Sequence, residues 1–473
     1  MGAVRPGGED IEVIKMLASQ DAALVAQPGN KQAGAAGREE TAPTREADGQ
    51  PLFRALLDEA LSEVIRREPS YFARFALALP PLGAQARHYA RHPLFDGCRD
   101  AAIEAALSSG IDVLRERGVR VGEADGEADP VALLLCDSIA DAFAASTGRL
   151  GLSAGAGLAA ADAVSAACTE RWTASSRRYF MGGARSADGR PLVLINACGM
   201  PLSLWSGLIG DTSHPWPLIA AESPCTDPIR GGMRAAVPLS GDSSVIALAL
   251  DDARVDRADL LAWCNGARIA IEFAGRFPDR VRSLILVSPT LRGAAGATPA
   301  GSAFEDDLNR IFVMVDARPH LAKAFADAFR SRFECTAWGK LANHPEQRAA
   351  TLLGLPARER VSALVAPMVQ PDFLVNYGRR VLRDQQYPIH TALRGLKSPV
   401  LLVTGDYDDR VNNAFTCAVL RAWGVRFLHA QIKGAGHYLY DLQYQYFRLI
   451  LSAFLAGRPP PPAARIEMQE ATA

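Results

Sequence analysis

The sequence predicts an α/β protein whose central sheet is mostly parallel. After residue 177, short apolar runs alternate with helical patterns, which is typical of parallel strands joined by crossover helices. One long helical segment interrupts this alternation, and another precedes it. The chain has 473 residues, of which 49% are hydrophobic and 22% are charged, so it can form a large buried core with appended units.

Charge and hydropathy exclude several classes of function. The 51 Lys and Arg residues balance 52 Asp and Glu residues, so no net field attracts the chain to nucleic acid. The N-terminus lacks the apolar run of a secretory signal, and no run approaches the roughly 20 residues that cross a bilayer. We therefore expect a cytoplasmic protein with no nucleic-acid partner and no membrane span. Its eight cysteines show no metal-ligand spacing, so we expect no metal and no cofactor.

The chain before residue 171 divides into two parts. Residues 1–50 are rich in Gly, Ala, Glu and Thr and predict a flexible arm, because they offer little apolar surface to bury. From Leu52, apolar residues recur at spacings of three and four, which predicts a helical N-terminal region over residues 51–170. The sequence assigns no role to this region.

Six apolar runs are the candidate strands of the core. They are residues 191–196, 216–221, 259–263, 283–288, 399–404 and 425–432. The first four fall in residues 171–290 and the last two in residues 398–458, which predicts one core in two parts. The helical insertion 291–397 between them has the position of a lid. Because prolines 459–462 end the last helical pattern, residues 459–473 are predicted to be a tail.

The most informative segment surrounds Cys264. A predicted strand ends at Trp263, a tight turn follows, and a helical pattern begins directly after it. Ala262 and Gly266 supply small residues two before and two after Cys264, as a chain that nearly folds back on itself requires. Such a turn would present the thiol beside a helix N-terminus, which favours the thiolate form. A buried structural cysteine is the alternative interpretation.

This A-x-C-x-G pattern resembles the nucleophile elbow, G-x-S-x-G, of the α/β-hydrolase superfamily, with cysteine in place of serine. The resemblance covers residues 177–290 and 398–456. It implies an α/β-hydrolase fold with a helical lid and a helical N-terminal extension, and it implies the chain order nucleophile, acid, histidine.

The resemblance also assigns the partners of Cys264. The run GDYDDRV follows a predicted strand and matches G-x-x-D-x-x-V, which makes Asp408 the acid, with Asp406 and Asp409 as alternatives. The run KGAGH resembles the G-x-G-H loop that carries the catalytic histidine, which makes His437 the base.

Further site residues follow from the same resemblance. The oxyanion hole would use the backbone N–H of Asn265, after the nucleophile, and that of Cys198, in the loop NACGMP after an earlier strand. Glu222 and Asp227 follow the next strand near the expected pocket mouth and are candidate substrate contacts. Ordinary solvation in a loop is the alternative for both.

A cysteine nucleophile bears on the reaction, because its covalent intermediate is a thioester. Capture of an acyl group from another thioester would be nearly isoenergetic. The cysteine elbow, NACGMP and GAGHYLYD together resemble thioesterase-like enzymes associated with polyketide and nonribosomal peptide assembly lines. The resemblance implies an off-loading enzyme that takes an acyl chain from a carrier-protein phosphopantetheine or CoA-type thioester. The enzyme would then release, cyclise or transfer the chain in specialised-metabolite biosynthesis.

Two other functions stay open at this point. A Dieckmann-type cyclase, which closes a carbon–carbon bond, also suits a cysteine nucleophile. In that group the acid follows the strand after the nucleophile helix, where this chain has Ser288, Pro289 and Thr290 and no carboxylate. A non-catalytic binding protein of the same fold is the second alternative. The sequence indicates neither the carrier partner nor the oligomeric state.

Overall fold

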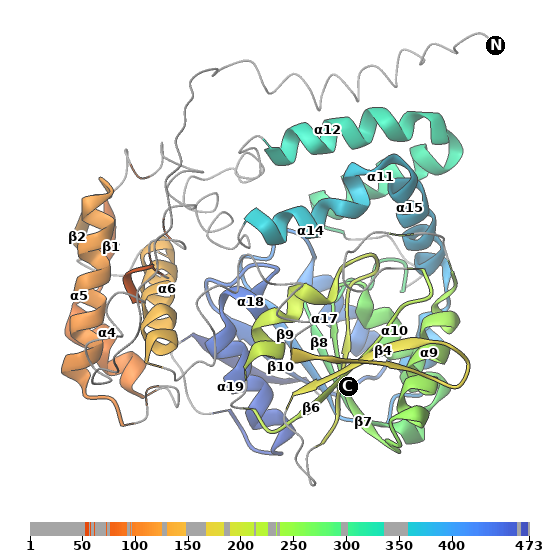
Figure 1. Cartoon of the computed structure of the whole chain (residues 1–473), viewed down its shortest axis with the longest axis horizontal. Helices are drawn as coiled ribbons and strands as arrows, with labels where there is room; N and C mark the ends of the chain where they lie inside the picture. The colour runs from red at the N-terminus through yellow and green to blue at the C-terminus, as the bar shows by residue number, and fades with distance from the viewer. Residues whose placement is uncertain are drawn as a thin grey trace, which may run out of the picture.

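The computed structural model describes residues 53–55, 57, 61, 72, 76–91, 95, 97–124, 130–147, 167–183, 190–211, 214–225, 233, 237–294, 301–334, 358–460 and 465–471. The predicted arm, residues 1–50, lies outside them. Figure 1 shows a group of N-terminal helices beside a twisted sheet, and a layer of helices above that sheet. No helix of the described part is both long and apolar enough to cross a bilayer.

Within the described residues the central sheet has nine strands, in the order β11-β10-β9-β8-β7-β5-β6-β4-β3. Neighbours from β10 to β6 are parallel, whereas β11, β4 and β3 pair antiparallel at the two edges. All six predicted strands form, which confirms the mostly parallel sheet. The strands are β3 (Thr169–Trp172), β4 (Arg178–Gly183), β5 (Leu192–Ile195), β6 (Pro217–Ala221), β7 (Ala258–Trp263), β8 (Val281–Val287), β9 (Val400–Gly405), β10 (Phe427–Ile432) and β11 (Ile466–Ala471).

The two faces of the sheet are buried against different helices. Alternate residues of a strand point to opposite faces, and in β7 both faces are apolar. Leu260 and Ala262 pack with the helices of one face, whereas Leu261 and Trp263 pack with those of the other. The first face is covered by α9 (Leu239–Asp252), α10 (Gly266–Arg276), α16 (Ile389–Arg394) and α17 (Asn413–Ala422). The second is covered by η2 (Leu202–Trp205), α8 (Ser206–Gly210), α18 (Leu439–Leu442) and α19 (Tyr444–Leu455).

The N-terminal region is helical, as predicted. Its main helices are α4 (Leu82–Ala90), α5 (Asp100–Glu116) and α6 (Pro130–Ser146). A short parallel pair, β1 (Leu77–Leu79) with β2 (Val121–Glu123), joins them. Sequence analysis did not predict this pair, because three residues are too few to show a period of two.

The insertion forms a layer above the carboxyl ends of the parallel strands (Figure 1). Its helices are α11 (Ala303–Ala317), α12 (Ala322–Glu334), α14 (Arg358–Val369) and α15 (Pro371–Gln386), with η4 (Pro319–Leu321) between the first two. The predicted lid, 291–397, also included α16. Ile389 and Leu393 of α16 are buried against the core instead, so that helix belongs to the sheet-covering layer.

The tail prediction, 459–473, is wrong for residues 466–471. These residues form β11, which pairs antiparallel with β10 from Ile432↔Ile466 to Phe427↔Ala471. Ile466 and Met468 pack against the core, while glutamates and a glutamine alternate with them. The last helix ends at Leu455, before the prolines, and the chain then returns to cover the exposed edge of the sheet.

A buried ion pair joins the N-terminal helices to this returning segment. Asp137 of α6 is 1% exposed and Arg465 is 6% exposed, and the two side chains form a salt bridge. The hydroxyl groups of Tyr89 and Tyr446 also donate to Asp137 Oδ1, at 2.7 and 3.2 Å. The carboxylate therefore connects α4, α6, α19 and the start of β11.

Replacing Asp137 with alanine should destabilise the chain strongly, because it leaves the Arg465 guanidinium buried without its counter-charge. We expect the free energy of unfolding to fall by about 3–5 kcal/mol, measured by urea unfolding with circular dichroism. Asp112→Ala, which removes an exposed pair with Arg115 on α5, is the matched control. It should cost less than about 1 kcal/mol. Equal losses from the two variants would contradict this role of Asp137.

Candidate active site

Cys264 lies on a strained turn between β7 and α10. Its φ is +54°, a conformation that residues with a side chain rarely adopt. The Cys264 N–H donates to the carbonyl of Val287 at the end of β8, at 3.0 Å. A Cβ on residue 266 would lie 2.4 Å from the carbonyl oxygen of Asn196, so only glycine fits there. The predicted tight turn and its need for a small residue at position 266 are confirmed.

The structure brings the predicted acid and base together. His437 follows β10 and Asp408 follows β9, and His437 Nδ1 lies 3.0 Å from Asp408 Oδ2. Asp408 Oδ1 accepts the backbone N–H groups of Arg410 and Val411, at 2.9 and 3.1 Å, which fixes the carboxylate. The two alternative acids point elsewhere. Asp406 accepts the Gly434 N–H, and Asp409 pairs with Arg410.

Electrostatic coupling extends from Asp408 to Cys264. Burial lowers the pKa of His437, but the Asp408 carboxylate and the Cys264 sulfur raise it more, and the result is a pKa of about 10. Burial raises the pKa of Asp408, but the charge and hydrogen bond of His437, together with hydrogen bonds from Ser288 and the Val411 N–H, leave that pKa below its ordinary value. His437 also hydrogen-bonds to Cys264. The three side chains therefore form one chain of contacts, with the imidazole protonated at neutral pH.

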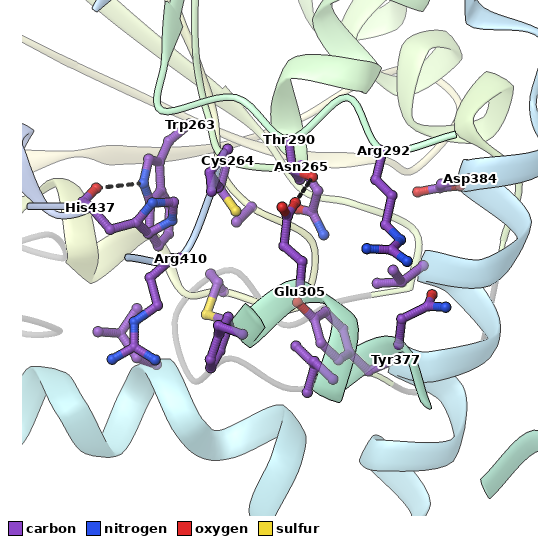
Figure 2. Close-up of a pocket in the computed structure, with 18 of the residues that line it drawn as sticks. Trp263, Cys264, Asn265, Thr290, Arg292, Glu305, Tyr377, Asp384, Arg410 and His437 are labelled. Atoms are coloured by element: carbon purple, nitrogen blue, oxygen red, sulfur yellow. Dashed lines mark hydrogen bonds between the residues drawn. The ribbon is translucent and has the colours of Figure 1, made fainter. Parts of the chain in front are cut away.

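Aromatic packing supports the loop that carries His437. Trp263, the last residue of β7, donates its indole N–H to the His437 carbonyl at 3.2 Å (Figure 2). Its ring centroid lies 5.2 Å from that of Tyr440, which in turn lies 4.3 Å from that of Trp205. Because these rings are buried, the histidine loop is held by the same residue that leads into the nucleophile turn.

A cavity of about 110 Å³ lies between this site and the lid. Most of its lining is apolar and comes from α11, α14 and α15. That part of the lining includes Phe304, Leu308, Phe312, Leu364, Val365, Met368 and Val381. The first helix of the lid is tied to the site, because Thr290 donates to Glu305 and Ser302 donates to the Arg410 carbonyl at 2.6 Å. The described residues contain no cluster of His, Cys, Asp and Glu suited to a metal ion.

The predicted oxyanion hole needs a correction. The Asn265 N–H lies at the N-terminus of α10, where backbone amides point out of the helix. The Cys198 N–H, however, donates to Asn265 Oδ1 at 2.7 Å, and the Ala197 N–H donates to Asn196 Oδ1 at 3.0 Å. The expected second donor, Cys198, therefore already has an acceptor within the protein. The sequence could not show this, because it depends on the direction of the Asn265 side chain.

Glu222, one of the two candidate substrate contacts, does not line this cavity. Glu222 accepts two hydrogen bonds from the Arg178 guanidinium, both at 2.9 Å, beside the antiparallel pair β4–β6. This pairing was not foreseen, because sequence analysis did not predict β4, which brings Arg178 next to Glu222. Asp227 lies outside the described residues.

The cavity is also lined by residues to which the sequence analysis gave no role. Tyr377 of α15 is buried and lines the same cavity as Cys264 and His437. The available signal was its spacing from Arg380 and Asp384, which places three polar residues on the buried face of one helix. Glu305 and Arg410 also line the cavity, and no motif distinguished either of them.

The chain matches the family model of the alpha/beta hydrolase fold over residues 243–444. This stretch runs from α9 into α19 and contains Cys264, Asp408 and His437. The chain therefore has the predicted α/β-hydrolase fold, with a mostly parallel central sheet and many helices.

Several solved structures are similar to this chain at low sequence identity. A membrane phospholipase A described as a bacterial virulence factor is 18% identical, with 76% of this chain and 96% of that chain covered and a TM-score of 0.47. Carboxylesterase CesB from Bacillus subtilis is 16% identical, with 65% and 100% covered and a TM-score of 0.43. Naproxen esterase from Bacillus subtilis is 14% identical, with 64% and 99% covered and a TM-score of 0.44. A comparison with curated proteins finds no match.

The ion pair of His437 predicts a pH-dependent contribution to stability. Its pKa is about 10 in the folded chain and about 6.5 in an unfolded chain. The stabilisation is therefore complete below about pH 6.5 and is lost as the pH rises through about 10. Urea unfolding of the unchanged chain and of His437→Gln should show a stability difference that narrows between these values. A difference that is constant or widens as the pH rises would contradict the charged pair.

Proposed function

We propose that this chain is an acyl-transferring enzyme in which Cys264 is the nucleophile, His437 the base and Asp408 the acid that orients it. It takes an acyl chain from a carrier-protein phosphopantetheine or CoA-type thioester and releases, cyclises or transfers it. The observation that carries the proposal is the contact chain Cys264–His437–Asp408 on a strained turn beside an apolar cavity. The proposed role of the enzyme in specialised-metabolite biosynthesis rests on the sequence resemblance.

The reaction proceeds in two half-steps. The Cys264 thiolate attacks the thioester carbonyl carbon, and the oxygen that gains negative charge lies by the Asn265 N–H. Collapse of this intermediate breaks the carbon–sulfur bond of the substrate, and His437 gives its proton to the departing thiolate. The acyl group is then held on Cys264 as a thioester. Water, or a nucleophilic group of the chain or of an acceptor, attacks next, and its proton passes to His437 as the Cys264 thiolate leaves.

The nucleophile favours a thioester substrate over an oxygen ester. Transfer from one thioester to another keeps the type of bond, so the acylation step is nearly isoenergetic. Transfer from an alkyl ester to a cysteine would instead make a less stable bond from a more stable one. The cavity fits this substrate class, because its lid side presents Phe312, Leu364 and Met368 to an acyl chain.

The position of the acid bears on the choice between acyl transfer and carbon–carbon ring closure. Ser288 occupies the site after β8 where the Dieckmann-type group carries its acid, and its hydroxyl group faces the Asp408 carboxylate. The acid thus comes from the later strand β9. This supports release, heteroatom cyclisation or transfer. A protein that only binds has no use for a buried His437–Asp408 pair beside a strained cysteine.

Intact-protein mass spectrometry with a panel of acyl N-acetylcysteamine and acyl-pantetheine thioesters tests the proposal. We expect an acyl adduct, placed on Cys264 by peptide mapping, and no adduct with Cys264→Ala. His437→Ala should lower kcat for thioester turnover by about 10⁴-fold, because the base and its charge are both removed.

The matched control is Cys98→Ser, which alters another partly exposed cysteine in the N-terminal region. It should leave both the adduct and the turnover intact. The proposal fails if folded protein captures no acyl group and turns over no thioester, or if the adduct persists in Cys264→Ala.

A further inference from the structure

The N–H group of Cys198 is covered by the side chain of Asn265. It donates to Asn265 Oδ1 at 2.7 Å. That oxygen belongs to a carboxamide, so it resembles the carbonyl oxygen of an acyl group in its capacity to accept hydrogen bonds. The backbone N–H of the same asparagine is the first donor expected for the oxyanion. Asn265 therefore bears on both donors of the expected oxyanion hole.

The loop that carries Cys198 lies against the nucleophile turn. In the parallel pair β5–β7, Ile195 is in register with Ala262, so the residues that follow the two strands run side by side. Gly266 of the turn lies against the Asn196 carbonyl at the start of the loop. The Cys198 N–H is therefore beside the turn, where the second oxyanion donor is expected. Both segments line one cavity, to which they contribute Ala197, Met200, Cys264 and Asn265.

Hydrogen bonds within the loop hold its shape independently of Asn265. Asn196 accepts the Ala197 N–H at 3.0 Å and donates through its amide nitrogen to the Met200 carbonyl at 3.2 Å. The Met200 N–H also donates to the Ala197 carbonyl, at 3.0 Å. These bonds lie on both sides of Cys198, so its N–H would keep its direction if the Asn265 side chain moved away.

The helix after the turn does not use the Asn265 side chain either. Asn265 is the N-cap residue of α10, a position at which asparagine usually accepts an N–H from the first turn of the helix. Here the side chain makes no capping bond. It accepts the Cys198 N–H instead. The contact between Asn265 and Cys198 therefore supports neither the cap of α10 nor the bonds within the loop.

We propose that the Asn265 side chain closes the oxyanion hole of the resting enzyme, and that the acyl carbonyl oxygen of a bound substrate takes its place on the Cys198 N–H. The inference rests on the proposed function. Asn265 lines the cavity beside Cys264 (Figure 2), which gives its side chain room to turn. Once it has turned, the backbone N–H groups of Asn265 and Cys198 both serve the developing oxyanion. Because binding must first break one hydrogen bond, the closed state lowers the apparent affinity for the substrate.

Asn265→Ala tests the proposal, because it removes the side chain and keeps the backbone donor. We expect kcat/KM for an acyl N-acetylcysteamine thioester to rise by about 2–10-fold, the contribution of one neutral hydrogen bond. The affinity for an acyl trifluoromethyl ketone should rise by a similar factor, since its adduct on Cys264 carries an oxyanion. Alkylation of Cys264 by chloroacetamide forms no oxyanion, so its rate should not change. A purely structural role of Asn265 would instead lower all three.

Asn309→Ala is the matched control. Asn309 of α11 lines the same cavity, so this variant also removes a carboxamide and enlarges the cavity, but it uncovers no N–H group of the loop. It should raise neither kcat/KM nor the affinity for the ketone. An equal gain in the two variants would show that added space, and not the uncovered N–H, causes the effect, and it would overturn the proposal.

A crystal structure of the unchanged chain with the trifluoromethyl ketone bound to Cys264 tests the same point without any variant. We expect the ketone oxygen within hydrogen-bond distance of the backbone nitrogens of Cys198 and Asn265, with the Asn265 side chain turned away. An adduct in which Asn265 Oδ1 still accepts the Cys198 N–H would overturn the proposal. This measurement decides the question even if Asn265→Ala does not fold.

The outcomes separate this inference from the proposed function. Unchanged or lower kcat/KM in folded Asn265→Ala, while the unchanged chain acylates Cys264, would overturn the role of Asn265 alone. If the unchanged chain forms neither an acyl adduct nor a ketone adduct on Cys264, the proposed function itself fails, and this inference fails with it.

Discussion

The site depends on the strained turn at Cys264. The chain leaves β7 with a positive φ at this residue, and that conformation persists because neighbouring strands hold it on both sides. On one side the Cys264 N–H is bonded to the end of β8, and on the other Gly266 lies against the backbone of Asn196 after β5. A cysteine on a regular helix or strand could not project in this way. The parallel order β5, β7, β8 is therefore a direct requirement of the nucleophile, since both restraints come from its neighbours in the sheet.

The second constraint is electrostatic. Asp408 and His437 are both buried, and burial alone would favour their neutral forms. Their mutual contact, with the backbone N–H groups of Arg410 and Val411, keeps the carboxylate charged and the imidazole protonated instead. The lid takes part in this arrangement, because Ser302 at the start of α11 donates to the Arg410 carbonyl. The acid loop, the histidine loop and the lid are thus joined to one another by hydrogen bonds.

The sequence was informative where chemistry follows chain order. Cys264 could be found from the small residues on either side of it, Asp408 from the predicted strand before it, and His437 from its glycine-rich loop. Long apolar runs predicted every central strand. Edge elements were missed for a physical reason. β4 and β11 are partly exposed, so their patterns are weak, and without β4 the pairing of Glu222 with Arg178 could not be foreseen. Cys198 shows a second limit, because the direction of one side chain, Asn265, decides whether the Cys198 N–H already has an acceptor within the protein. No local pattern encodes that direction.

The central claim is that cysteine makes this α/β-hydrolase frame an acyl-thioester enzyme. The most direct measurement compares kcat/KM for an alkyl thioester and the alkyl oxygen ester of the same acyl group, with the unchanged chain and with Cys264→Ser. The account predicts a strong preference of the unchanged chain for the thioester, by about 100-fold or more, and a much smaller preference in the serine variant. Equal or faster turnover of the oxygen ester by the unchanged chain would contradict it.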